Sequence, residues 1–165
     1  MSAPLSPVPT RTPGWRGTET LLLYAAYLLG AWGINGMGAI LLPLQGEFGV
    51  PRTGVAFYPT LYSSALVVVG IVGGMFVRRV GLHRTMVAAL ALTVLGPTLM
   101  MAPSRLVIGI GAFVFGLGGA LVALVLPVRF SALHGRRSAR AITEANALGS
   151  LGAIVAPLAV ALALA

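Results

Sequence analysis

The stretch Leu106–Val128, LVIGIGAFVFGLGGALVALVLPV, contains no charged residue and decides the class of fold. A helix needs about 20 apolar residues to cross the hydrocarbon core of a bilayer, and this stretch is long enough. Four further charge-free stretches occupy residues 21–44, 53–77, 85–102 and 145–165. Because backbone polar groups cannot stay unpaired in lipid, each stretch is predicted to be a helix. We therefore expect an all-α, polytopic transmembrane bundle with five spans over residues 19–165.

The composition of the chain excludes several other classes of protein. Of the 165 residues, 58% are hydrophobic and 8% are charged, whereas a soluble domain has about a quarter charged residues. The absence of cysteine excludes disulfides, thiol catalysis and thiolate metal sites. No Asp and only three Glu are present, which leaves little for carboxylate chemistry. We expect neither an enzyme nor a cofactor or metal site.

All eleven basic residues are arginines, in short clusters between the apolar stretches. This pattern is typical of membrane topology rather than of nucleic-acid binding, which we do not expect. Alternate connections place two arginines, Arg52 and Arg105, on one side. They place nine on the other side, which is predicted to be cytoplasmic: Arg11, Arg16, Arg78, Arg79, Arg84, Arg129, Arg136, Arg137 and Arg140. The proline-rich residues 1–18 are then a disordered cytoplasmic tail, on a multi-pass protein of the cell (inner) membrane.

The connection between the second and third apolar stretches contains a recognisable motif. It resembles the loop signature G-x-x-x-D-R-x-G-R-R of the major facilitator superfamily. Gly74, Arg79 and Gly81 match this signature, and Arg84 lies one place past its last basic residue. Arg78 stands where the family has its acidic residue, so the charge relay of that loop is not expected here.

Two later segments add to the resemblance. Arg136, Arg137 and Arg140 form a stretch similar to the second basic loop of the family. Gly152 and Pro157 match the pattern G-x-x-x-G-P of its fifth helix, with alanine in place of the second glycine. The resemblance runs from about residue 21 to residue 165, so it covers nearly the whole chain.

The resemblance implies a membrane secondary transporter that moves a small solute by alternating access. Family members have twelve helices in two halves, so the five spans would be an N-terminal portion that is truncated before the sixth helix. Its expected partners are the lipid bilayer, an unidentified solute, and either the missing C-terminal helices or another membrane chain. The alternative is a small, non-transporting membrane scaffold or regulatory protein.

Three polar side chains inside the spans are candidates for the substrate pathway: Tyr27, Asn35 and Tyr62. Polar groups at membrane depth usually face a protein interior or a cavity. For the tyrosines, anchoring at the membrane interface remains an alternative. For Asn35, the alternative is a hydrogen bond between helices.

Several other residues are expected to have structural roles. Gly70 and Gly74 have the GxxxG spacing of close helix packing. Glu19 and Glu144 are predicted in the first turns of their helices, where an acid interacts favourably with the helix dipole. His134, like His83, is predicted to lie on the surface of a basic loop, without metal-ligand spacing.

Overall fold

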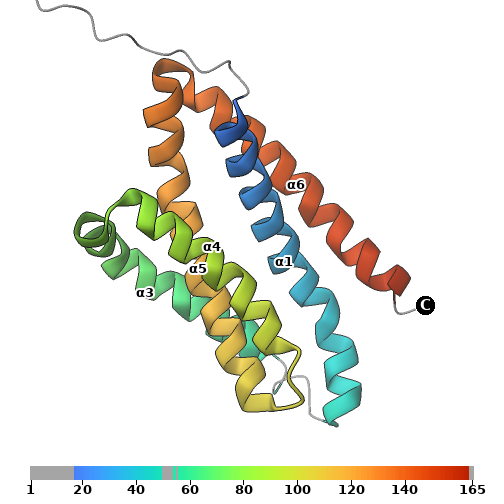
Figure 1. Ribbon diagram of the computed structural model, residues 1–165. Helices are drawn as coiled ribbons and strands as arrows, with labels where there is room; N and C mark the ends of the chain where they lie inside the picture. The colour runs from blue at the N-terminus through green and yellow to red at the C-terminus, as the bar shows by residue number, and fades with distance from the viewer. Residues whose placement is uncertain (1–16, 50–53, 55, 164–165) are drawn as a thin grey trace, which may run out of the picture.

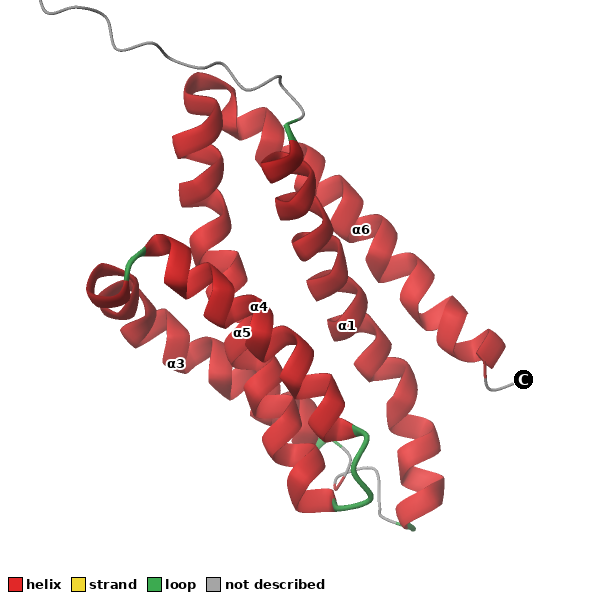
Figure 2. Ribbon diagram, in the orientation of Figure 1, coloured by secondary structure: helices red, strands yellow, loops and turns green. Residues whose placement is uncertain are grey.

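The protein is built from helices. The computed structural model describes residues 17–49, 54 and 56–163. Its helices, shown in Figure 1, are α1 (Thr18–Phe48), α3 (Phe57–Val80), α4 (Leu82–Met100), α5 (Arg105–His134), the short 3-10 helix η1 (Gly135–Arg137) and α6 (Ser138–Ala163). The described residues contain no strand (Figure 2). The prediction of an all-helical chain is confirmed.

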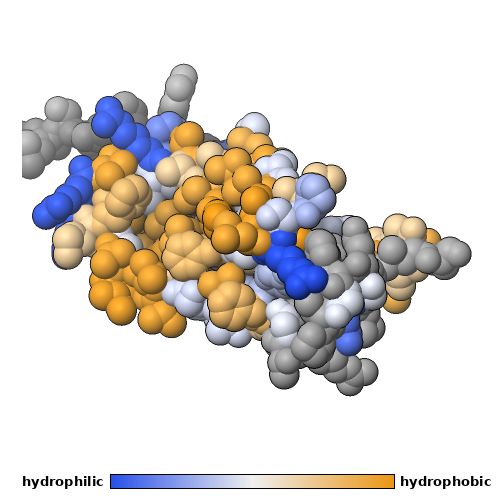
Figure 3. Space-filling model, turned by 90° about the horizontal axis from the view of Figure 1, so that it is seen from below, coloured by the Kyte–Doolittle hydropathy of each residue, from blue (hydrophilic) through white to orange (hydrophobic). Residues whose placement is uncertain are grey.

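Four helical stretches are long and apolar enough to cross a membrane. They are Thr18–Ala39, Phe57–Val80, Leu82–Met100 and Arg105–Ala163, the last of which includes both α5 and α6. Their large apolar side chains are widely exposed, and hydrophobic residues cover much of the described surface in Figure 3. Such a surface is suited to lipid rather than to water.

The helices extend beyond the charge-free stretches at several ends. α5 continues to His134 rather than ending near residue 128, and α6 begins at Ser138 rather than near residue 145. Arg129 and Arg140 therefore lie inside helices, and η1 alone connects α5 to α6. The charge-free length measures what fits in hydrocarbon, whereas backbone hydrogen bonding continues into the polar region beyond it.

The helices form two groups around α5. α3 and α4 pack on α5, and α1 packs on α6 with contacts that run from Tyr24 to Gly36 of α1 (Figure 1). Gly96 of α4 lies against Phe115 of α5, whereas Thr93 lies against the later residue Gly118, so α4 and α5 are antiparallel. The group α3–α5 and the pair α1–α6 meet mainly along α5.

Glycines in α5 allow its two close neighbours to approach. Gly109 and Gly116 face α3, where an added Cβ at Gly116 would lie 2.5 Å from the carbonyl oxygen of Tyr62. Gly111 and Gly118 face α4, where an added Cβ at Gly118 would lie 2.6 Å from the backbone nitrogen of Thr93. Each pair is spaced by seven residues, which is two helical turns and returns to the same face.

The GxxxG pair of α3 has a different environment. Gly70 and Gly74 are exposed, and an added Cβ on either would meet no atom within 4 Å. Gly73, between them, is buried against Leu124 of α5. The pair therefore makes no close packing with another described helix, because the helix turns those two positions outward.

Most described arginines lie toward one end of the bundle because of the directions in which the helices run. α3 and α5 finish at this end, and α1, α4 and α6 begin there, as the antiparallel contacts require. Among the described arginines, only Arg105 starts a helix at the opposite end. The others lie toward the first end: Arg78, Arg79, Arg84, Arg129, Arg136, Arg137 and Arg140. Arg11, Arg16 and Arg52 fall outside the described residues.

Candidate functional site

A cavity of about 190 Å³ lies where α1 faces α3, α4 and α5. Tyr27 of α1 and Tyr62 of α3, two of the three candidates for the substrate pathway, both line it. The rest of its wall includes Ala31, Thr93, Gly119 and Ala123. We refer to this space as the tyrosine cavity.

The position of Tyr62 is determined by α5. Its ring packs on Phe115, with the ring centroids 5.5 Å apart and the planes tilted by 51°. Its hydroxyl lies over Gly119, where an added Cβ would come within 2.9 Å of the hydroxyl oxygen. The residue is only 8% exposed. A glycine at position 119 therefore leaves the space into which the hydroxyl extends.

A glycine on α6 makes room for Tyr27 in the same way. An added Cβ at Gly149 would lie 2.6 Å from Cε1 of the Tyr27 ring. Gly149 was not predicted from the sequence to position a side chain. The spacing of three residues between Gly149 and Gly152 could have predicted this role, because residues three apart share a helix face.

The hydroxyl groups of Tyr27 and Tyr62 have no hydrogen-bond partner among the residues that the structure describes. Tyr24, one turn before Tyr27 on α1, differs in this respect, because its hydroxyl donates to Oε2 of Glu144 at 2.9 Å. The tyrosine cavity therefore has two phenol groups that are free to bind a guest molecule.

A second, larger cavity of about 530 Å³ adjoins the first. Its lining includes Trp32 and Met37 of α1, Met100 and Met101 at the end of α4, and Phe115 of α5. We refer to it as the methionine cavity. Thr93 lines both cavities, and its hydroxyl donates to the carbonyl oxygen of Ala89 at 2.8 Å. Among the residues that the structure describes, neither lining includes an ionisable side chain other than the two tyrosines.

Asn35, the third candidate for the substrate pathway, lines neither cavity. Its side chain is exposed, and Nδ2 donates to the carbonyl oxygen of Ala31 at 2.8 Å. The interhelical hydrogen bond considered as an alternative is also not observed for this residue. A carbonyl one turn back on the same helix satisfies the amide instead.

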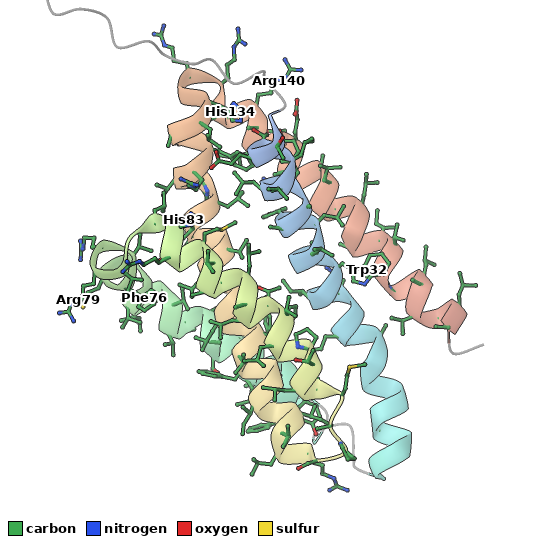
Figure 4. The ribbon with its side chains drawn as sticks, viewed as in Figure 1. Trp32, Phe76, Arg79, His83, His134 and Arg140 are labelled. Carbon is green, nitrogen blue, oxygen red and sulfur yellow. The ribbon has the colours of Figure 1, made fainter. Side chains whose placement is uncertain are left out.

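A cluster of polar side chains joins α1, α5 and α6 at the arginine-rich end. Arg129 pairs with Glu19 at 2.6 Å. Glu144 accepts from Tyr24 at 2.9 Å and from Nε of Arg140 at 3.0 Å. We name these residues, together with Thr20 and His134, the polar cluster; Figure 4 shows His134 and Arg140 beside the start of α1.

Two expectations about this end require correction. Glu144 is not in the first turn of its helix, because α6 already begins at Ser138. His134 is half-buried rather than on the surface, with Nε2 lying 3.0 Å from the Thr20 hydroxyl and its ring against Phe130. Both differences arise because the helices extend into the segment expected to be a loop. Glu19 does lie in the first turn of α1, as predicted.

The residues of the predicted loop motif surround a sharp turn. Gly81 joins α3 to α4 with φ of 91°, a conformation that favours glycine. Arg78 and Arg79 lie in the last turn of α3 and Arg84 in the first turn of α4, all exposed. Figure 4 shows Arg79 pointing away from the bundle. This motif lies apart from the lining of both cavities.

The remaining motif residues lie around α6. Arg136 and Arg137 form η1, and Arg140 belongs to the polar cluster. Gly152 is buried against α1, where an added Cβ would lie 3.1 Å from the carbonyl oxygen of Leu28. Pro157 is exposed within α6. Gly152 therefore brings α6 close to α1.

Neither a search for metal ligands nor a comparison with known proteins assigns a further function to the described residues. Among the described residues, no group of three His, Asp or Glu side chains is placed to hold a metal ion. Comparison of the chain with protein-family profiles, curated proteins and solved structures finds no significant match.

Proposed function

We propose that this chain is the N-terminal part of a major facilitator-type secondary transporter that moves a small solute by alternating access. The observation that supports this most is the tyrosine cavity. It lies between the pair α1–α6 and the group α3–α5, and it contains two hydroxyls that have no partner among the described residues. Solute sites of such transporters lie near the membrane midplane between helix groups. The order of the sequence motifs supports the same assignment.

In this proposal the chain crosses the cell (inner) membrane five times, with its N-terminus in the cytoplasm. α5 and α6 count as separate spans because η1 reverses the direction of the chain between them. The excess of arginines at one end supports the orientation, since basic residues are retained on the cytoplasmic side. The polar cluster then forms part of the cytoplasmic wall of the pathway.

The opposite wall of the pathway is supplied by further helices, either from the same protein or from another membrane chain. Movement of the pair α1–α6 against the group α3–α5 would open the tyrosine cavity to each side of the membrane in turn. The residues assigned to solute contact are Tyr27 and Tyr62. The partners in this mechanism are the bilayer and a small solute.

Accessibility of single cysteines tests this proposal, because the natural chain contains no cysteine. Ala123→Cys places a thiol in the tyrosine cavity, and Ile71→Cys places one on the outer face of α3, where Ile71 is 77% exposed. The complete gene is expressed, and an impermeant methanethiosulfonate is applied to right-side-out and inside-out vesicles. We expect Ala123→Cys to react from both sides and Ile71→Cys, which faces lipid, from neither.

A third variant, Arg137→Cys in η1, tests the orientation and should react only in inside-out vesicles. Reaction of Ala123→Cys from a single side would contradict alternating access and would favour the scaffold or regulatory role. Reaction of Arg137→Cys from outside would reverse the proposed topology.

A further inference from the structure

We infer that the tyrosine and methionine cavities together form one binding site for an uncharged aromatic solute with a single hydrogen-bonding group. This inference rests on the proposed function and extends it to a class of solute. The hydrogen-bonding group would bind in the tyrosine cavity, and the apolar body would occupy the methionine cavity. Thr93, which lines both, marks the place where they adjoin.

The tyrosine hydroxyls provide the polar end of the site. Tyr62 is more than nine-tenths buried, yet its hydroxyl has no partner among the described residues. A hydrogen bond from this hydroxyl to a solute would contribute about 0.5–1.5 kcal/mol, and Tyr24 shows that a tyrosine in this bundle is paired where a partner is near. A hydroxyl or carbonyl group of a solute would pair with Tyr62, and Tyr27 lines the same cavity.

The methionine cavity suits an aromatic body. Trp32 and Phe115 provide ring surfaces, and Met37 and Met100 provide polarisable thioethers, which make favourable contacts with aromatic rings. Its volume of about 530 Å³ falls in the range of about 300–1,000 Å³ that is usual for small-molecule sites.

The absence of charge from both linings selects against ions. None of the described lining residues is Arg, His or Glu, so a charged solute would lose its hydration without gaining a counter-ion from them. Burial of an uncompensated charge is strongly unfavourable. Thr93 adds only a hydroxyl oxygen that accepts a hydrogen bond, since its proton is already donated to Ala89.

A scintillation proximity assay with radiolabelled 1-naphthol tests the site on the purified full chain in detergent. 1-Naphthol has one aromatic body and one hydroxyl, as the inference requires. Unlabelled naphthalene and 1-naphthalenesulfonate serve as competitors with the same rings. We expect saturable binding of 1-naphthol, competition by naphthalene, and competition by the sulfonate at least about tenfold weaker than that by naphthalene.

Two substitutions locate the binding. Gly119→Ala places a methyl group 2.9 Å from the Tyr62 hydroxyl and should weaken 1-naphthol binding about tenfold or more, whereas Gly70→Ala, with no atom within 4 Å, should leave it unchanged. Tyr62→Phe, which removes one oxygen, should weaken 1-naphthol about fivefold and leave competition by naphthalene unchanged. This second variant preserves the test if Gly119→Ala fails to fold.

Three outcomes would overturn the inference. They are unsaturable uptake that is the same in every variant, equal losses for Gly119→Ala and Gly70→Ala, and competition by the sulfonate that matches naphthalene. The result is separable from the transport proposal. Specific 1-naphthol binding combined with one-sided labelling of Ala123→Cys would leave the site in place and remove transport.

Discussion

The two flanks of α5 differ in how closely a neighbouring helix approaches. Toward α4, backbone lies against backbone, because Gly96, Gly111 and Gly118 carry no side chain. Toward α1, the tyrosine cavity lies between the helices, which meet where Gly33 lies against the ring of Phe115. The polar cluster then holds α1 to α5 and α6 at the arginine-rich end.

This difference indicates which part of the bundle is rigid. Close packing without voids resists displacement, whereas a boundary with cavities loses few contacts when it moves. We therefore expect the group α3–α5 to behave as a frame and the pair α1–α6 to move against it, with the polar cluster as the restraint.

The largest effect is expected for Gly96→Ala, on the flank toward α4. The added Cβ would lie 2.6 Å from the backbone nitrogen of Phe115, and overpacking of this kind costs about 1–3 kcal/mol. The free energy of unfolding in SDS–detergent mixtures is the measurement. The matched control is Gly70→Ala, which meets no atom within 4 Å and should gain up to about 1 kcal/mol from helix propensity. Equal stability of the two variants would refute the close α4–α5 contact.

A smaller effect is expected in the polar cluster. Glu144→Gln removes the charge that accepts from Tyr24 and Arg140, and the free energy of unfolding should fall by about 1 kcal/mol. The control is a double-mutant cycle with Tyr24→Phe, in which the second substitution should cost less once the first is present. Strict additivity would mean that this hydrogen bond does not hold α1 to α6.

The smallest effect on stability is expected in the tyrosine cavity. Tyr62→Phe removes a hydroxyl that has no partner among the described residues, so the free energy of unfolding should change by less than about 0.5 kcal/mol, or rise slightly. The same unfolding assay measures it, with Tyr24→Phe as the matched variant at a paired hydroxyl. A loss as large as that of Tyr24→Phe would show that Tyr62 has a structural partner.

The helices could be predicted from the sequence because the hydropathy of consecutive residues is enough to indicate them. Long charge-free stretches such as Leu106–Val128 indicate helices without any knowledge of their neighbours. Helix ends could not be predicted equally well, since Ser138 and His134 lie in charged segments where hydropathy is uninformative. The same limit explains the incorrect placement of Glu144 in a first turn.

The candidate site could be predicted only in part. Tyr27 and Tyr62 stood out as polar residues in apolar stretches, and both line one cavity. Asn35 stood out in the same way but bonds to its own helix, which residue type alone cannot reveal. The sequence indicates that a polar residue lies within a membrane span, but the rotation of its helix determines what the side chain faces. The same rotation determines that Gly73 packs against α5 and that Gly70 is exposed.

The alternating glycine pairs of α5 limit how the length of this helix can vary. Gly109 and Gly116 face one neighbour, and Gly111 and Gly118 face another. One residue inserted between positions 112 and 115 would rotate the later glycines by about 100° relative to the earlier ones. The contacts of α5 with α3 and with α4 would then both be lost on one side of the insertion. Insertions or deletions compatible with folding should therefore be confined to the connecting segments, and the distance between these glycines should be fixed wherever this architecture recurs.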